Sequence, residues 1–163
     1  MASWKPLLLK SLDSNAHLKH SAFFQLATVG SDGRPSNRTV VFRGFQEGTD
    51  MIQINTDRRS AKIEEIQHCR FGEQREKAWF ASSLKSRLQY LASTPSLPAI
   101  TTNDPGEELK LDPSEGPVDA FCLLIFDPDQ VDYLNLRSNE RLIFTSKPNG
   151  SSCKLWMSQK INP

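Results

Sequence analysis

The stretch FFQLATVGSDGRPSNRTVVFRGF, residues 23–45, decides the fold. Its two ends are rich in aromatic and β-branched residues, and they flank the turn-forming cluster GSDGRP at residues 30–35, whose two glycines bracket an aspartate. Two such runs separated by a short cluster of turn residues are typical of a β-hairpin. The sequence therefore predicts one strand over residues 22–29 and a second strand over residues 37–45.

The rest of the chain predicts further strands, with helices at the N-terminus and in the middle. A strand over residues 51–55 follows the polar turn QEGTD and would complete an antiparallel meander with the hairpin. Apolar residues at helical or alternating spacing predict the remaining elements. These are helices over residues 5–20, 56–67 and 74–92, and strands over residues 120–126, 131–135, 141–145 and 154–163. This order of elements predicts an α+β, mainly β fold in which most of the sheet is antiparallel.

Length and charge limit the organisation and the partners. A chain of 163 residues has room for one hydrophobic core, so we expect a single domain over residues 1–163. Within it, residues 94–117 combine several prolines with polar residues, which predicts an irregular connection. Lys and Arg number 20 against 19 Asp and Glu, so the net charge is +1. Because this balance gives no long-range field, we expect neither nucleic acid nor a membrane as a partner.

Cysteines, histidines and apolar runs indicate the compartment. Three cysteines without a C-x-x-C pair argue against a disulfide scaffold or a zinc ribbon and favour reduced, packed thiols. His17 and His20 lie three residues apart, but no further ligand pattern accompanies them, and we expect no metal site. The apolar run at residues 7–9 is too short for a signal peptide or a membrane span. Together these features predict a soluble, cytoplasmic protein.

Two arginines interrupt the second strand of the hairpin, which otherwise has the composition of a buried strand. Because side chains alternate across a strand, Arg38 shares one face with Val40, and Arg43 shares the other with Thr39 and Val41. A guanidinium inside a sheet requires a carboxylate or a ligand, and its fork of donors suits a phosphate.

The segment NTDRRSAK, residues 55–62, supplies further groups for such a ligand. It joins the end of a predicted strand to the start of a predicted helix, where free backbone N–H groups and the helix dipole favour an anion. Its candidate ligands are Asn55, Thr56, Ser60 and Lys62. If the hairpin brings Arg38 alongside, two cations and two hydroxyls converge, which is the composition of a phosphate pocket.

The same arginines also have a purely structural explanation. Glu47, Asp50 and Asp57 are acidic residues nearby in the sequence that can pair with Arg38 or Arg43 at the rim of the sheet. Exposed ion pairs of this kind contribute only about 0–1 kcal/mol each. The spacing by itself leaves both explanations open.

Four stretches together resemble a known family. Residues 23–45, quoted above, and INTDRRSAKIEEI at residues 54–66 are similar to the N-terminal half of the flavin-binding split-barrel family that includes pyridoxamine 5′-phosphate oxidase, in its plant and cyanobacterial oxidase-like branch. FDPDQVDYLNLRSNERLIF at residues 126–144 and the closing WMSQKINP at residues 156–163 are similar to the family's ending. The resemblance implies a split β-barrel with flanking helices, a homodimer, and flavin mononucleotide (FMN) in the groove between its subunits.

The resemblance also implies which residues hold the FMN phosphate. Arg38 and Lys62 would bind it, and Ser60 and Thr56 would add hydroxyl or amide donors. Asn55 stands where the true oxidases commonly have an aromatic residue.

A second group would lie along the flavin itself. The resemblance implies that the backbone of Thr39, Val40 and Val41 follows the flavin. Arg43 stands where the oxidases have a lysine close to the flavin and the substrate. The two arginines of the strand would therefore serve opposite ends of the cofactor.

The chain departs from the family pattern in three places. Leu134 stands where the oxidases carry a tryptophan beside the flavin, and residues 141–144 replace an Arg-Leu-His-Asp-Arg segment that serves substrate and cofactor. Family members also place two strands between the helix that contains SAKIEEI and the one that begins at QREKAWF, whereas only residues 67–73 join them here. A central hairpin of the barrel is therefore expected to be absent.

Two functions follow from the resemblance. The first is an FMN-dependent oxidoreductase that oxidises pyridoxamine or pyridoxine 5′-phosphate to pyridoxal 5′-phosphate, an aldehyde of the vitamin B6 group. Since the flavin carries such chemistry, the protein needs no catalytic triad of its own. The alternative, which the departures favour, is a non-catalytic flavin-binding protein or a truncated form that retains only dimerisation.

Overall fold

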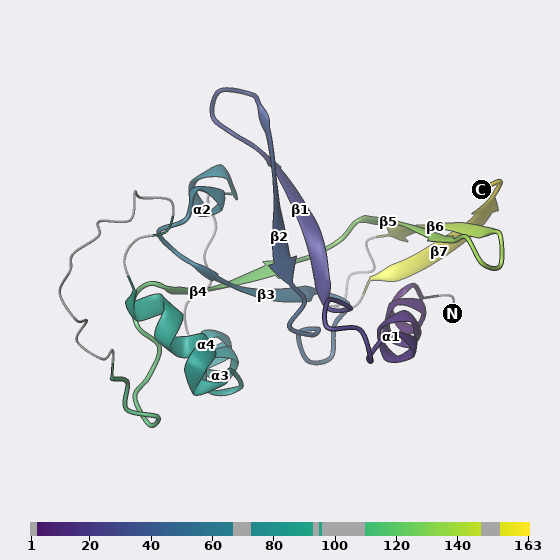
Figure 1. Cartoon of the computed structure of the whole chain (residues 1–163). Helices are drawn as coiled ribbons and strands as arrows, with labels where there is room; N and C mark the ends of the chain where they lie inside the picture. The colour runs from purple at the N-terminus through teal and green to yellow at the C-terminus, as the bar shows by residue number, and fades with distance from the viewer. Residues whose placement is uncertain (1–2, 67–72, 93–94, 96–109, 148–153) are drawn as a thin grey trace. The chain divides into compact units, whose positions relative to one another are not determined.

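The computed structural model describes residues 3–66, 73–92, 95, 110–147 and 154–163 (Figure 1). Its helices are α1 (Lys5–Ser14), α2 (Ala61–Ile66), α3 (Glu73–Phe80), α4 (Leu84–Leu88) and the 3-10 helix η1 (Gln89–Leu91). Its strands are β1 (Phe23–Val29), β2 (Pro35–Val41), β3 (Ile52–Asp57), β4 (Phe121–Phe126), β5 (Gln130–Asn135), β6 (Glu140–Lys147) and β7 (Leu155–Ile161). The strands pair as β1-β2, β3-β4 and β5-β6-β7. The predicted α+β, mainly β fold is confirmed, and these sheets do not close into a barrel within the described part of the chain.

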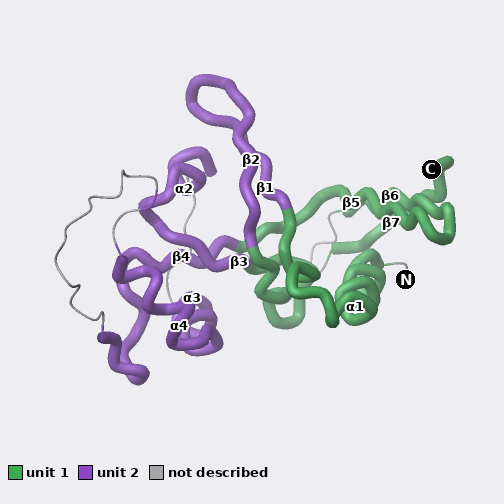
Figure 2. Tube along the Cα trace, in the orientation of Figure 1, with its two compact units in different colours: residues 1–24, 41–53, 125–163 green, residues 25–40, 54–124 purple. Residues whose placement is uncertain are grey.

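The chain divides into two compact units, each described by itself (Figure 2). Unit 1 comprises Met1–Phe24, Val41–Gln53 and Ile125–Pro163, and unit 2 comprises Gln25–Val40 and Ile54–Leu124. The expectation of a single domain over residues 1–163 stays a prediction. Of the predicted irregular connection, residues 110–117 contain neither helix nor strand, and residues 94 and 96–109 lie outside the described residues.

The predicted hairpin is present as β1 and β2. Gly30 N donates to the Arg34 carbonyl at 2.9 Å, and Gly33 turns the chain with a φ of 76°, a conformation that favours glycine. The second strand ends at Val41 instead of Phe45. Gly44, with a φ of 107°, interrupts the extended backbone there.

The predicted three-strand meander is therefore wrong as a single sheet. In the described part of the chain, the segment after β2 is joined to the start of β3 only by an isolated antiparallel bridge, Phe45 to Ile52, and the hydrogen bonds around it. From there β3 pairs with β4, which lies far along the chain. The pairing of β3 with β4 joins segments that are far apart in the sequence, so a local sequence pattern does not predict it.

Unit 1 is built on the antiparallel sheet β5-β6-β7 and helix α1. Phe144 in the centre of β6 lies opposite Val131 of β5 and is 2% exposed. It packs with Trp4 and Trp156, whose rings meet edge to face at 5.9 Å between centroids. The N-terminal helix predicted over residues 5–20 is shorter than expected and ends at Ser14.

Unit 2 has its own aromatic core. Trp79 and Phe121 are fully buried and pack with Tyr90 and Leu111. The long helix predicted over residues 74–92 is wrong, because the chain forms α3, α4 and η1 in succession. Ser83 is the physical reason: its side chain accepts a hydrogen bond from Ser86 N and caps a new helix.

Two further findings concern cysteine and membranes. Cys122 in β4 is fully buried and disulfide-bonded, so the prediction of reduced thiols is wrong for this residue. Cys69 and Cys153 lie outside the described residues. Within the described ranges, no helix is both long and apolar enough to cross a membrane.

Candidate functional site

The predicted site residues fall into both units. Seven lie in unit 2, namely Arg38, Thr39, Val40, Asn55, Thr56, Ser60 and Lys62, and two lie in unit 1, namely Val41 and Arg43. The groups predicted to hold a phosphate therefore share one unit and can be compared directly. That these nine residues bind FMN stays a prediction.

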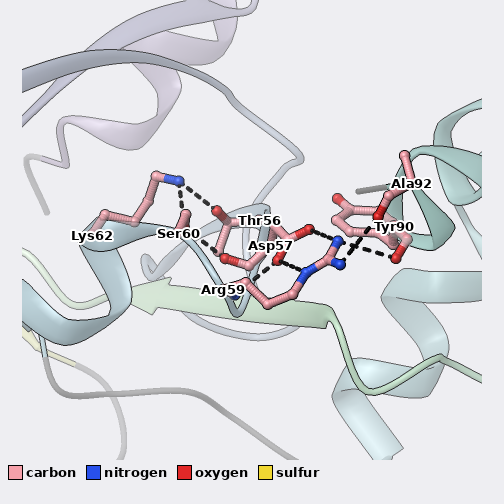
Figure 3. A network of polar contacts seen from close by, with 7 residues as sticks. All are labelled: Thr56, Asp57, Arg59, Ser60, Lys62, Tyr90 and Ala92. Atoms are coloured by element: carbon pink, nitrogen blue, oxygen red, sulfur yellow. Dashed lines mark hydrogen bonds and ion pairs between the residues drawn. The ribbon is translucent and has the colours of Figure 1, made fainter. Parts of the chain in front are cut away.

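Lys62 lies at one end of a compact polar cluster (Figure 3). Its Nζ atom donates to Thr56 Oγ1 at 2.8 Å and to Ser60 Oγ at 2.8 Å. Thr56 is 6% exposed, and the Ser60 hydroxyl donates in turn to the Asp57 carbonyl at 2.6 Å. One ammonium and two hydroxyls from the end of β3 and the start of α2 thus converge, as the sequence predicts.

The charge on Lys62 is costly where it lies. Burial lowers its pKa below the ordinary 10.5 and the nearby positive charge of Arg38 lowers it further, while Asp57 and Glu65 act in the opposite direction. Among the described residues no carboxylate oxygen lies within ion-pair distance of this ammonium. An anion placed there would therefore find a cation with no partner carboxylate.

Arg38 is held by a carboxylate that the sequence reasoning did not consider. Its guanidinium donates to Thr28 and, at 2.8 Å, to Glu65 Oε2. The Arg38 and Glu65 side chains are 21% and 12% exposed. Arg38 thus forms an ion pair, as the structural explanation expects. Its partner, however, is Glu65 on α2 and not Glu47, Asp50 or Asp57.

Glu65 is ionised and well supplied with donors. The hydrogen bond from Thr28, whose Oγ1 lies 2.5 Å from Glu65 Oε2, lowers the pKa of Glu65 most strongly, and Arg38 and Ser36 add to this against the effect of burial. A phosphate that used Arg38 would have to share it with this carboxylate or displace it.

Asp57 and Arg59 form a second clamp in the turn between β3 and α2 (Figure 3). Arg59 Nε donates to Asp57 Oδ1 at 3.0 Å and Nη2 to Asp57 Oδ2 at 2.7 Å, a bidentate pair. The same guanidinium donates to the Ala92 carbonyl at 3.1 Å and to the Tyr90 carbonyl at 3.4 Å. Arg59 therefore ties the turn that carries Ser60 to the end of η1.

Helix α2 begins directly after the turn that carries Ser60 and comprises Ala61–Ile66 among the described residues. That its N-terminus attracts the anion stays a prediction.

Strand β2 presents its residues as the alternation predicts. Val40 is buried and Arg38 half-buried, whereas Thr39 is exposed and accepts a hydrogen bond from Gln25 Nε2 at 2.9 Å. In unit 1, Val41 is half-buried and Arg43 is exposed, with its backbone N–H donating to the Gln53 carbonyl at 2.9 Å.

Asn55 carries an unused acceptor. Its Nδ2 donates to Ser82 Oγ at 3.0 Å, while its buried Oδ1 has no hydrogen-bond partner among the described residues. Asn55 also lines a cavity of about 220 Å³ with Thr56, Asp57, Gln89, Tyr90 and Pro95.

Unit 1 contains a larger cavity of a different kind. It has a volume of about 370 Å³ and is lined mainly by aromatic and aliphatic side chains, with Asp132 as its charged group. Among the described residues no lysine or arginine lines this cavity, so its lining does not suit a phosphate.

The comparisons with known proteins identify the class to which this fold and cluster belong. The family model for the pyridoxamine 5′-phosphate oxidase FMN-binding domain matches residues 1–90. The chain belongs to this FMN-binding family, and FMN is its cofactor.

Individual relatives agree with this assignment. The chain is 48% identical to pyridoxine/pyridoxamine 5′-phosphate oxidase 2 of Arabidopsis thaliana over 195 aligned positions, which cover 100% of this chain and 98% of the relative. A crystal structure of a pyridoxamine 5′-phosphate oxidase-related, FMN binding protein from Nostoc punctiforme has a TM-score of 0.84 at 32% identity, covering 100% of this chain and 99% of that chain.

A more distant structure shows the fold alone. PhzG from Burkholderia lata, in complex with tetrahydrophenazine-1-carboxylic acid, has a TM-score of 0.71 at 16% identity, covering 97% of this chain and 91% of that chain. Together with the Nostoc structure it confirms the predicted split-barrel type of fold.

The Arabidopsis alignment also bears on the missing hairpin. It spans 195 positions, more than the 163 residues of this chain, so the relative carries residues that this chain lacks. This agrees with the predicted loss of a central hairpin. Its location between α2 and α3 stays a prediction.

Sequence reasoning missed the residues that organise the cluster. Glu65 and Thr28 hold Arg38, and Arg59 holds Asp57. The Asp57–Arg59 spacing in a turn was a usable local signal, because an aspartate often accepts hydrogen bonds from residues two positions on. The Glu65 contact had no such signal, since Arg38 lies 27 residues away from it.

Proposed function

We propose that this protein is an FMN-dependent oxidase that converts pyridoxamine or pyridoxine 5′-phosphate to pyridoxal 5′-phosphate. The observation that carries the proposal is the Lys62 cluster in a chain 48% identical to a pyridoxine/pyridoxamine 5′-phosphate oxidase. An ammonium, two hydroxyls and a neighbouring guanidinium are a donor set that suits a phosphate ester.

The residues of the chain serve binding and orientation. Lys62, Thr56 and Ser60 hold the FMN phosphate, and Arg38 contributes positive charge beside them. Asn55 offers its Oδ1 atom to a hydroxyl group of the part of FMN that links the phosphate to the flavin ring. Arg43, which is exposed in unit 1, supplies positive charge close to the flavin and the substrate. When bound, FMN supplies the redox chemistry of the reaction.

The overall reaction balances with dioxygen as the oxidant. The carbon that bears the amine or alcohol loses a hydride and the heteroatom loses a proton, and dioxygen takes up these two electrons and two protons to give hydrogen peroxide. An alcohol substrate gives the aldehyde directly. An amine gives an imine, which takes up water and releases ammonia.

The proposal includes a homodimer in the cytoplasm. The dimer takes its support from the family resemblance, in which FMN lies between subunits. Size-exclusion chromatography with light scattering on the flavin-loaded protein tests the dimer.

Turnover tests the activity. The protein, purified with FMN and yellow, is mixed with pyridoxamine 5′-phosphate in air, and formation of pyridoxal 5′-phosphate and peroxide is followed together. We expect equal amounts of both products. Flavin that stays bound without any turnover contradicts the oxidase.

That outcome would support the second candidate, a non-catalytic flavin-binding protein. Leu134, which replaces the tryptophan of the oxidases, is 46% exposed. Arg141, at the segment that should serve the substrate, is held by Asp132 through hydrogen bonds of 2.6 to 3.2 Å. These departures from the oxidase pattern support the second candidate.

A further inference from the structure

Lys62 carries its charge next to two carboxylates, and each of them is held by an arginine. Asp57 and Glu65 both act on the pKa of Lys62, so both fields reach its ammonium. Yet Glu65 pairs with Arg38, and Asp57 pairs with Arg59. Among the described residues, Lys62 therefore has no carboxylate within ion-pair distance, although the charges of Asp57 and Glu65 both act on it.

The Asp57–Arg59 pair is the tighter of these two arrangements. Both carboxylate oxygens of Asp57 accept from the Arg59 side chain, and Asp57 Oδ1 also accepts from Arg59 N at 2.8 Å. The Asp57 side chain is 11% exposed, so water has little access to it. Without Arg59, this carboxylate would be left poorly solvated in the turn that also carries Ser60, a direct contact of Lys62.

Such a carboxylate would be stabilised by another positive charge within reach. Burial raises the pKa of Asp57, but the hydrogen bonds and charge of Arg59, with a contribution from Lys62, hold the pKa below its ordinary value. Lys62 already attracts this carboxylate and is itself half-buried. An ion pair between the two would neutralise the cation that the phosphate needs.

We propose that Arg59 is a positioning residue that keeps the Asp57 carboxylate away from Lys62 and so preserves Lys62 for the phosphate of FMN. This inference rests on the proposed assignment of Lys62 to that phosphate. Arg59 itself touches neither the phosphate nor the reacting atoms. Its contacts to the Tyr90 and Ala92 carbonyls fix the guanidinium in the direction that holds Asp57.

A double-mutant cycle with two ligands tests the proposal. Wild type, Arg59→Ala, Asp57→Asn and the double variant are titrated with FMN and with riboflavin, which lacks the phosphate. We expect Arg59→Ala to weaken FMN binding by roughly tenfold or more, the effect of losing one charge-assisted hydrogen bond, with riboflavin affinity nearly unchanged. The double variant should regain most of the FMN affinity, because the competing carboxylate is gone.

A merely structural role predicts a different pattern. If Arg59 only supports the turn, Asp57→Asn cannot restore FMN binding, and a double variant as weak as Arg59→Ala overturns the proposal. Should Arg59→Ala not fold, Arg59→Gln replaces it, because the amide can still donate to the carbonyls of η1 without carrying charge. Arg58→Ala is the matched control for net charge, and an equal loss of FMN affinity there also overturns the proposal.

Failure of the underlying function would look different again. Lys62→Ala is measured in the same assay. If it leaves the preference for FMN over riboflavin unchanged, the phosphate assignment itself is wrong. If Lys62→Ala removes that preference and Arg59→Ala does not, only the role of Arg59 is refuted.

Discussion

Arg38 Nη2 lies 2.8 Å from Glu65 Oε2, and this ion pair joins strand β2 to helix α2 within unit 2. The Arg38 guanidinium of this pair lowers the pKa of Lys62, and the Glu65 carboxylate acts on the pKa of Lys62 in the opposite direction. A phosphate bound at Lys62 would therefore meet one additional positive and one additional negative charge.

Removing the negative charge should favour the phosphate. We expect Glu65→Gln to raise the affinity for FMN while leaving that for riboflavin unchanged, because repulsion of the phosphate disappears and Arg38 becomes available. The variant should also unfold at a lower temperature, since Arg38 loses its partner. Fluorescence titration with both flavins measures the first effect. Glu64→Gln on the exposed side of α2 is the control, and a similar gain there would point to net charge alone.

Removing either cation should weaken the cofactor's hold. Arg38→Ala and Lys62→Ala are each expected to lower FMN affinity by about 1.5–3 kcal/mol, the range for hydrogen bonds to charged groups. Because Lys62 titrates below its ordinary pKa of 10.5, wild-type affinity should fall as the pH rises toward that value, and this fall should be absent in Lys62→Ala. Unchanged affinity in both variants would refute the phosphate assignment.

The Asp57–Arg59 clamp should stabilise the fold in a pH-dependent manner. The pKa of Asp57 in the folded protein lies below its ordinary 3.8, so its contribution is present above 3.8 and is lost as the pH falls through the lower folded value. Asp57→Asn should therefore lower the free energy of unfolding by about 1 kcal/mol at neutral pH. In urea titrations the difference from wild type should disappear in strong acid. A difference that is constant with pH would mean that the lost contact does not depend on charge.

A hydrogen bond ties the C-terminal strand of unit 1 to the turn before β3. Trp156 Nε1 donates to Asp50 Oδ2 at 2.8 Å, across 106 residues of sequence. Trp156→Phe keeps an aromatic ring but removes the donor, and we expect a loss of about 1–2 kcal/mol in the free energy of unfolding. Met157→Leu, at a side chain that is 54% exposed, serves as the control and should be close to neutral.

The core of unit 2 depends on Trp79. This residue is fully buried against Phe121 and Tyr90, and its Nε1 donates to the Glu115 carbonyl at 2.9 Å. We expect Trp79→Ala to lower the free energy of unfolding by about 3–5 kcal/mol, the range for emptying an aromatic site in a core. Phe80→Ala, at the next residue but 44% exposed, should cost far less. Calorimetry on the FMN-loaded protein distinguishes the two, and equal losses would contradict the packing seen here.

Local patterns predicted the elements that depend on local geometry. The β1-β2 hairpin follows from alternating apolar residues on both sides of a glycine-containing turn, and the placement of Arg38 with Val40 on one face follows from the period of a strand. The cluster of Thr56, Ser60 and Lys62 can also be predicted from the sequence. Its members lie within seven residues of one another at the junction of a strand and a helix.

Only the tertiary structure decided which charges pair. Arg38 had three acidic candidates near it in the sequence and takes Glu65 instead, which helix α2 carries to the strand. Likewise β3 pairs with β4, so the predicted meander does not form a single sheet. Ser83 begins a new helix within a stretch whose apolar spacing by itself predicts one long helix. The physical reason is that secondary structure depends on the spacing of neighbouring residues, whereas an ion pair or a strand pair depends on which distant segments are brought into contact.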